Sequence, residues 1–229
     1  MTAERARGFP ARFPVRDDGL RPLRYHFVSA GSRAGLRALF GRGLDVSSLL
    51  RMPTQGPLLV ACNHLSNIDP FIFGGYGPGT MFCMAKKELF SNPVQAWVLA
   101  GCNCFPVDRG AADRWALRIS LDVLRNDGRL LLFVEGTRAA KPGMKRAEAG
   151  VGFLARRSGV PVLPIAVWGS ELALNRDRRI PRRVPITLKV GEPFSPEVPS
   201  GRGADAVVAD AIGRRIAELL PPEYRGYYA

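Results

Sequence analysis

Short, wholly apolar runs alternate along this chain with stretches that have helical periodicity. Within residues 112–126, leucines recur every three or four positions and charged side chains line the opposite side. A turn at 126–128 then leads into five apolar residues, 130–134, as expected of a buried central strand. Strands that alternate with helices form a parallel sheet covered by helices. The sequence therefore predicts an α/β fold with a mostly parallel central sheet flanked by helices.

The same pattern extends over most of the chain. We expect strands at 58–62, 80–85, 104–107, 130–134, 162–167 and 186–190. We expect helices near 70–73, 93–100, 112–126, 150–158 and 208–219. With 229 residues, of which 46% are hydrophobic, the chain is long enough for one domain with a sizeable core and short for two.

The N-terminal part differs in composition from the rest. Residues 1–22 are rich in Arg, Pro and Gly, and we expect a basic, disordered tail. Residues 23–45 read as a basic amphipathic helical arm with an apolar face that starts at Leu23 and Phe27. Gly31 and Gly35 interrupt the pattern, which predicts two short helices with a bend. The arm either lies in a membrane interface or packs on the body as a surface helix.

The formal net charge of +13 implies an anionic partner: nucleic acid, anionic lipid headgroups or phosphorylated small molecules. Ten arginines against four acidic residues fall in the first 51 positions. The chain has no helix-turn-helix or zinc pattern, and its aromatic residues are not interleaved with the arginines, which disfavours nucleic acid. The nucleotide motifs G-x-x-x-x-G-K-[ST] and G-x-G-x-x-G and the hydrolase motif G-x-S-x-G are also absent.

All four cysteines (Cys62, Cys83, Cys102 and Cys104) lie in or beside apolar runs. A metal site is the functional alternative, but we interpret them as small buried side chains in a reducing compartment. We see no signal peptide and no apolar span long enough to cross a bilayer. The expected location is the cytoplasmic face of a membrane, with peripheral attachment.

The loop that follows strand 58–62 carries the best candidate for catalysis. It places His64 and Asp69 at the carboxyl end of a strand, where open α/β sheets keep their sites. A carboxylate that holds one ring nitrogen of a histidine leaves the other nitrogen free as a base. The plain alternative is a histidine bonded within a turn, with Asp69 capping the helix that begins near Pro70.

Charged residues also follow the next strands. Arg109 comes after 104–107, and Glu135 and Arg138 come after 130–134, with Lys145 and Arg146 nearby. Because these tips converge on one edge of a parallel sheet, we expect them near His64. Arginine and lysine bind phosphate well. One base with several phosphate ligands and no Ser or Cys nucleophile suits the activation of a phosphorylated alcohol.

These motifs resemble the glycerolipid acyltransferase family, which includes bacterial 1-acylglycerol-3-phosphate acyltransferases. Four blocks of the family occur in order between residues 58 and 167: 63–69 (NHLSNID, an H-x4-D block), 101–109 (ending in FPVDR), 133–138 (FVEGTR) and 160–165 (VPVLPI). Val134 stands where the family usually has Pro, and Ala139 where Ser is common. Ala147 stands where Gly often follows a lysine pair, which affects the expected shape of that loop.

The resemblance implies an O-acyltransferase domain over residues 46–229. It implies a catalytic dyad of His64 and Asp69, and an acyl pocket that the fourth block helps to form. The residues that it implies for substrate binding are Arg109, Glu135, Gly136, Thr137, Arg138 and Lys145. It implies no metal and no cofactor, with acyl-CoA or acyl carrier protein as co-substrate.

The expected reaction transfers a fatty acyl group to a lysophosphatidate-like acceptor, in phospholipid biosynthesis at an anionic membrane surface. Within the family, the alternative acceptors are glycerol 3-phosphate, a lysophospholipid and a lipid amino acid. The alternative from another class is a non-enzymatic basic protein that binds nucleic acid.

Overall fold

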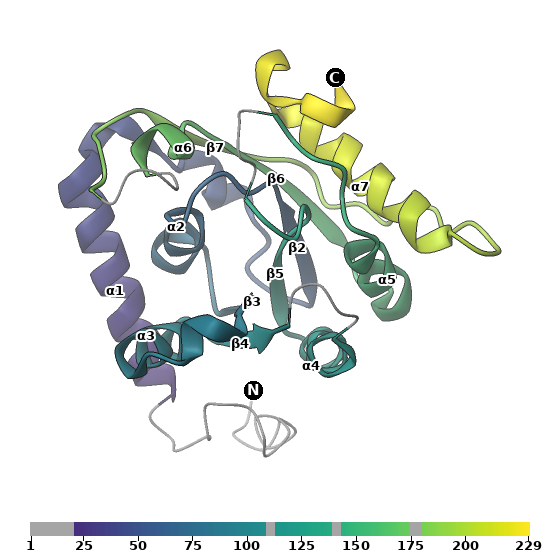
Figure 1. Ribbon diagram of the computed structural model, residues 1–229, viewed down its shortest axis with the longest axis horizontal. Coiled ribbons are helices and arrows are strands. Elements are labelled where there is room, and N and C mark those ends of the chain that lie inside the picture. The colour runs from purple at the N-terminus through teal and green to yellow at the C-terminus, as the bar shows by residue number, and fades with distance from the viewer. Residues whose placement is uncertain (1–20, 109–112, 139–142, 175–179) are drawn as a thin grey trace.

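The computed structural model describes residues 21–108, 113–138, 143–174 and 180–229. One sheet runs through the middle, with helices on both faces (Figure 1). Its strands are β1 (Leu44–Asp45), β2 (Leu58–Cys62), β3 (Met81–Lys86), β4 (Cys104–Val107), β5 (Arg129–Phe133), β6 (Val162–Trp168) and β7 (Ile186–Val190). The α-helices are α1 (Arg21–Phe40), α2 (Asp69–Tyr76), α3 (Pro93–Gly101), α4 (Arg114–Arg125), α5 (Ala149–Ser158), α6 (Ser170–Ala173) and α7 (Ala204–Leu219).

The strands lie in the order β1-β7-β6-β2-β5-β3-β4. Every neighbouring pair is parallel except β6 and β7, which are antiparallel. The predicted single α/β domain with a mostly parallel sheet is therefore confirmed. β2 pairs with both β5 and β6, and all five of its residues are buried. Burial on both faces explains why 58–62 is apolar without alternation.

Alternate side chains of each strand enter two separate cores. Leu59 and Ala61 point into a core that α4, α5 and α7 cover, whereas Val60 and Cys62 point into the core under α1 and α2. This two-sided arrangement is visible in Figure 1, where α1, α2 and α3 lie on one side of the strands and α4, α5 and α7 on the other. The carboxyl ends of β2 and β5 lie side by side, because Cys62 is the register partner of Phe133.

Helix α1 corrects two expectations about the N-terminal arm. It is one continuous helix of 20 residues, and not two short helices with a bend. Gly31 and Gly35 lie on its outer side, where an added Cβ would meet nothing within 4 Å, so they interrupt no packing. The packed face, not local propensity, supports a helix in a folded protein.

The buried face of α1 is also not the one expected. Tyr25, Val28 and Leu36 are buried, while Leu23 and Phe27 are 67% and 69% exposed. The helix therefore packs on the body through one face and keeps a second apolar face in solvent. No helix within the described residues is long and apolar enough to cross a membrane.

α1 and α2 approach closely at Gly75. A Cβ there would lie 3.0 Å from the backbone nitrogen of Arg33, so a larger residue would push the helices apart. In this arrangement the guanidinium Nε of Arg33 donates to the carbonyl of Gly75 at 2.7 Å. Tyr25 adds a second tie, since its hydroxyl donates to the carbonyl of Gly79 at 2.9 Å. The arm is thus fixed beside the loop that leads into β3.

Candidate active site

The loop after β2 holds His64 and Asp69 together. The Oδ2 atom of Asp69 lies 2.8 Å from Nδ1 of His64. The same oxygen accepts the backbone N–H groups of Leu65 at 2.9 Å and Ser66 at 2.8 Å. Asp69 is fully buried, and His64 is 6% exposed. With its Nδ1 proton donated to the carboxylate, the imidazole keeps a fixed orientation and leaves Nε2 as a proton acceptor.

The alternative role of Asp69 as a helix cap does not describe this loop. The N-cap residue of α2 is Ile68, and no side chain caps the helix. The carboxylate of Asp69, the first helical residue, turns back toward the preceding loop and His64. The contact between the imidazole and the carboxylate is therefore the main feature of the loop and not a by-product of capping.

Two neighbours outside the predicted site fix the loop further. The side chain of Asn63 donates to the carbonyl of Val167 on β6 and accepts from its N–H, both at 2.8 Å. Phe133, at the end of β5, stacks on the His64 ring with centroids 4.0 Å apart and planes 21° apart. Sequence spacing gave no sign of the stacking, because only the strand order brings Phe133 beside His64.

Glu135 joins this loop to the basic loop that follows β5. One carboxylate oxygen accepts from the N–H of His64 at 3.0 Å, and the other accepts from the N–H of Lys145 at 2.9 Å. The side chain is buried, with 2% of the residue exposed. Burial raises the pKa of Glu135, although these two amides act in the opposite direction. We expected Glu135 to bind substrate, and in the structure its carboxylate accepts from two backbone amides, one in each loop.

The other residues of the 133–138 block lie in the turn after β5. Gly136 has a φ of +65°, in the left-handed region that glycine adopts most easily. Thr137 and Arg138 are half-buried, and Arg138 lines the same pocket as His64. The turn thus brings a guanidinium to the pocket that holds the imidazole.

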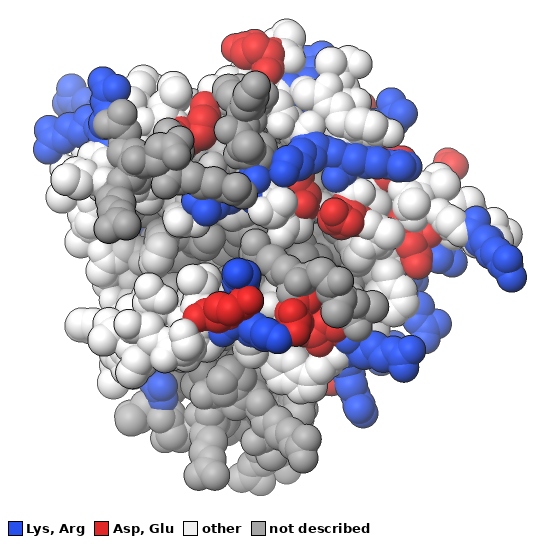
Figure 2. Space-filling model, viewed as in Figure 1, with Lys and Arg blue, Asp and Glu red and all other residues white. Residues whose placement is uncertain are grey.

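Of the two remaining predicted cations, Arg109 and Lys145, the structure describes only Lys145. Arg109 lies outside the described residues. Lys145 is exposed, with its backbone fixed by Glu135. Next to Arg109, Asp108 is described, and its carboxylate pairs with the ammonium of Lys87. Figure 2 shows Lys and Arg side chains spread over this face of the molecule, with Asp and Glu side chains between them.

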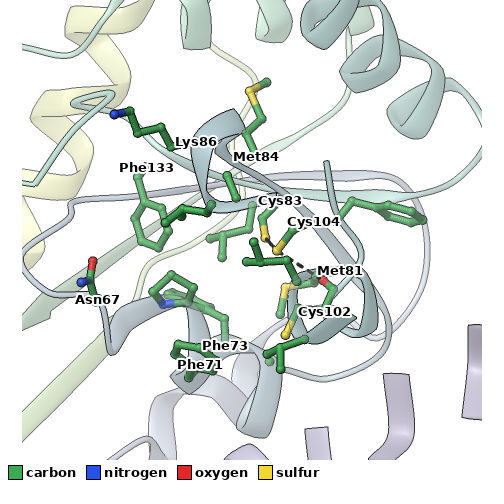
Figure 3. Close-up of a pocket in the computed structure, with 18 of the residues that line it drawn as sticks. Asn67, Phe71, Phe73, Met81, Cys83, Met84, Lys86, Cys102, Cys104 and Phe133 are labelled. Carbon is green, nitrogen blue, oxygen red and sulfur yellow. Dashed lines mark hydrogen bonds between the residues drawn. The ribbon is translucent and has the colours of Figure 1, made fainter. Parts of the chain in front are cut away.

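A pocket of about 480 Å³ opens beside His64, within the range of small-molecule sites. It runs between the strands β3, β4 and β5 on one side and α2 and α3 on the other. Figure 3 shows its two ends: Asn67 and Lys86 lie at one, and the sulfur atoms of Cys83, Cys102 and Cys104 gather at the other. Most of the wall between them is aliphatic or aromatic. The pocket therefore suits a molecule with a polar end near the imidazole and an apolar body.

The fourth sequence block does not line this pocket, contrary to our expectation. Its residues 162–165 belong to β6, and β2 separates that strand from β5, the nearest strand of the pocket wall. Leu163 and Ile165 are fully buried in the core under α1 and α2. The block is apolar because β6 is covered on both faces, which is a packing requirement.

The cysteines are mostly buried, as the sequence predicted. Cys62, Cys83 and Cys104 are buried and Cys102 is half-buried, all with free thiols. The sulfur atoms of Cys83 and Cys104 lie 2.8 Å apart on neighbouring strands. In the described ranges, no three His, Cys, Asp or Glu side chains form a group that could hold a metal ion.

Comparisons with known proteins agree with this geometry. The sequence model of a family described as "Acyltransferase" matches residues 43–168. The 1-acyl-sn-glycerol-3-phosphate acyltransferase of Bacillus subtilis is 27% identical over 183 residues, which cover 77% of this chain and 88% of that protein. The enzyme of the same name from Cocos nucifera is 30% identical over 138 residues, which cover 58% of this chain but only 44% of the longer plant protein.

A solved structure is also similar. The crystal structure of the 1-acyl-sn-glycerophosphate acyltransferase PlsC from Thermotoga maritima superposes with a TM-score of 0.69 and 25% sequence identity. The match covers 90% of this chain and 83% of that one. The similarity therefore extends beyond the matched blocks to most of the fold.

Proposed function

This chain belongs to the acyltransferase family, and we propose that it transfers a fatty acyl group to the free hydroxyl of a lysophosphatidate-like acceptor, 1-acylglycerol 3-phosphate, giving phosphatidate. The observation that carries the proposal is the imidazole of His64, held by Asp69 at 2.8 Å and facing a pocket with a long apolar wall. The names of the similar proteins support the choice of acceptor.

In the proposed reaction, Nε2 of His64 takes the proton of the acceptor hydroxyl as that oxygen attacks the carbonyl carbon of an acyl thioester. The new ester bond forms, the C–S bond breaks, and the imidazolium returns the proton to the departing thiolate. Asp69 orients the ring and stabilises the imidazolium. The donor is an acyl thioester of CoA or of acyl carrier protein.

The phosphate of the acceptor is proposed to bind the cationic side chains beyond the imidazole. Arg138 lines the pocket, and Lys145 is exposed on the loop that Glu135 ties to His64. Arg109 and the turn residues Gly136 and Thr137 complete the proposed binding set. Holding the acceptor so that its hydroxyl meets the thioester lowers the entropic part of the barrier.

The acyl chain is proposed to occupy the apolar body of the pocket, with its thioester end toward His64. The wall offers Phe71, Phe73, Met81 and Leu99 beside the buried sulfur atoms of Cys83 and Cys104. An alkyl chain that leaves water for such a wall gains roughly 0.8 kcal/mol per methylene. The end of the pocket beside Cys102 would then limit the length of the chain.

Peripheral attachment to a membrane is proposed through an exposed apolar patch of α1 and α3, formed by Leu23, Phe27, Val94 and Trp97. These side chains are 67%, 69%, 72% and 46% exposed. The rings of Phe27 and Trp97 are in contact, with centroids 6.2 Å apart, so the patch is continuous across the two helices. Val94 also lines the pocket, which would open toward the lipid. Exposed apolar patches of this kind mark interaction sites.

The patch can be tested with the double change of Phe27→Ser and Trp97→Ser. We expect several-fold weaker cosedimentation with vesicles that contain anionic lipid, because two exposed aromatic rings are lost. Val207→Ser is the matched control, since Val207 is 56% exposed on α7, across the sheet from the patch. Equal binding by all three proteins would contradict the proposed attachment.

The acceptor is tested by an acyl-transfer assay with 1-acylglycerol 3-phosphate, glycerol 3-phosphate, a lysophospholipid and a lipid amino acid in parallel. Products are identified by mass, and each acceptor is offered acyl-CoA and acyl carrier protein as donors. We expect 1-acylglycerol 3-phosphate to give the highest kcat/KM. A higher value for another acceptor would reassign the substrate within the family, and no transfer to any of them would reject the proposal.

A further inference from the structure

Residues 222–229, here called the tail segment, pair with the loop at 143–148, which carries Lys145. The N–H of Met144 donates to the carbonyl of Tyr224 at 3.0 Å, and the N–H of Tyr227 donates to the carbonyl of Met144 at 2.8 Å. Gly226 permits this approach, because a Cβ there would lie 2.3 Å from the carbonyl oxygen of Met144. The tail segment thus runs against the backbone of the loop itself (Figure 1).

The hydroxyl of Tyr228 makes the second attachment. It accepts from the N–H of Ala147 at 2.9 Å and donates to Oδ1 of Asp210 at 3.2 Å. Burial raises the pKa of Tyr228 to about 12, so the hydroxyl keeps its proton at neutral pH. Asp210 also receives two bonds from Arg146, Nε at 3.1 Å and Nη2 at 2.6 Å. One tyrosine and one aspartate therefore anchor two consecutive residues of the loop.

These contacts leave Lys145 in a distinct position. Its neighbours Met144 and Ala147 are buried, and the charge of Arg146 is paired with Asp210. Its own N–H donates to Glu135, whose other oxygen holds the N–H of His64. Lys145 is exposed, so its side chain remains accessible while its backbone is fixed from both sides. The contacts run from Tyr228 through the loop to Glu135 and reach the dyad.

We propose that Tyr228 and Asp210 are positioning residues that hold the 143–148 loop so that Lys145 meets the phosphate of the acceptor. The inference rests on the proposed function for the identity of the acceptor. Neither residue lines the pocket that holds His64, so each acts through the loop and not on the reacting atoms. Loss of either contact lowers the affinity for the acceptor and leaves proton transfer by His64 unchanged.

The test compares two hydroxyl deletions in the tail segment. Tyr228→Phe removes the bonds to Ala147 and Asp210, whereas Tyr224→Phe removes a bond of 2.7 Å to Glu171, away from the loop. Both variants lose a hydroxyl that is bonded to a carboxylate, so a purely structural role predicts similar effects. We expect Tyr228→Phe to raise the KM for 1-acylglycerol 3-phosphate about threefold to tenfold, the usual range for one or two hydrogen bonds, with kcat and the donor KM unchanged. Tyr224→Phe should leave the acceptor KM unchanged.

A double-mutant cycle with Lys145→Ala tests whether Tyr228 affects acceptor binding through Lys145. If Tyr228 acts through Lys145, the double variant should have the same acceptor KM as Lys145→Ala alone. The proposal would be overturned if the effects of Tyr228→Phe and Lys145→Ala on the acceptor KM multiplied in the double variant. It would also be overturned by an equal rise in KM for Tyr224→Phe, or by a fall in kcat with an unchanged KM for Tyr228→Phe.

Amide hydrogen exchange separates this inference from the proposed function. Tyr228→Phe should speed exchange at the amides of Lys145 and Ala147, and Tyr224→Phe should not. This readout holds even if the protein acylates none of the acceptors, an outcome that would reject the proposed function alone. Unchanged exchange at both amides in Tyr228→Phe would show that the hydroxyl does not hold the loop.

Discussion

The two loops that meet at Glu135 are held in opposite ways. In the loop after β2, the three groups that bind Asp69 Oδ2, the His64 ring among them, lie within five residues of that carboxylate. In the 143–148 loop, the anchors Asp210 and Tyr228 lie more than 60 residues away in the chain. The contact between His64 and Asp69 is thus local, although Asn63 and Glu135 tie its loop to the rest of the fold, whereas the second loop takes its main anchors from α7 and the tail segment. Changes in the tail segment should therefore affect acceptor binding and spare the dyad.

The largest effect should come from the loop after β2. His64→Ala removes the proposed base, and general-base catalysis contributes roughly 10²–10⁴-fold, so kcat should fall by at least about 100-fold. Asp69 keeps its two bonds from Leu65 and Ser66, and we expect the circular dichroism spectrum to be unchanged. Acyl transfer at the normal rate by the purified variant would remove the dyad from the mechanism.

A smaller effect should follow from forcing the second loop away from its anchors. Gly226→Ala places a Cβ against the backbone of Met144, and a displacement of about 1 Å near a site can cost up to roughly 100-fold, so we expect a rise of about 10-fold to 100-fold in acceptor KM with kcat nearly unchanged. Gly41→Ala is the matched control: its φ of +53° is close to the +56° of Gly226, but nothing lies within 4 Å of the added carbon.

Steady-state kinetics measure the acceptor KM of the two glycine variants, and thermal unfolding measures their stability. Both should lose about 1–2 kcal/mol of stability from the left-handed backbone. Gly226→Ala should lose more, because its Cβ meets the backbone of Met144, and only this variant should lose acceptor affinity. If Gly41→Ala raised the acceptor KM equally, the effect would reflect general destabilisation, and the contrast between the loops would fail.

The smallest effect should appear where the two loops join. The pKa of Glu135 is raised above 4.5 by burial, so the folded protein binds a proton there more tightly than the unfolded chain does. Stability from this group is therefore lost as pH rises from about 4.5 through the folded-state pKa. Glu135→Gln removes that contribution, so the difference in unfolding free energy between wild type and variant should change across this range and level off above it.

Urea unfolding of both proteins at a series of pH values from 4 to 8 measures this difference. Glu88→Gln is the control. The carboxylate of Glu88 pairs with Lys86 on the surface, and its pKa is lowered rather than raised. Its difference curve should have the opposite slope. A flat curve for Glu135→Gln would mean that the carboxylate is not held as the structure has it.

Sequence predicted best what neighbouring residues decide. Strands β2, β4 and β7 have the expected bounds, because β2 and β4 are short apolar runs and β7 alternates apolar with polar residues. The start of α3 is also decided locally, because Asn92 caps it with a side chain that accepts from the N–H groups of Val94 and Gln95. The contact of His64 with Asp69 belongs to the same class, since a turn of five residues can close on itself without help from the rest of the fold.

What the sequence could not supply depends on residues far apart in the chain. The stacking of Phe133 on His64 follows from the pairing of β2 with β5, and the attachment of Tyr228 follows from the path of α7. The two faces of α1 were exchanged for a similar reason: Leu23 and Phe27 fit a helical stripe as well as Tyr25 and Val28 do, and only contact with α2 and α3 decides which stripe is covered.

The reversed direction of β7 explains how the last residues reach the catalytic side of the sheet. After running against β6, the chain is at the amino-terminal edge, where Phe194 bridges to Val162. Helix α7 starts from there and returns, so that Tyr224 ends beside Glu171, just past the opposite end of β6. In a sheet with every strand parallel, a helix after the last strand would travel the other way. Because β7 is inverted, α7 runs back toward the catalytic edge of the sheet. Tyr228, which follows α7, can therefore hold the 143–148 loop at that edge.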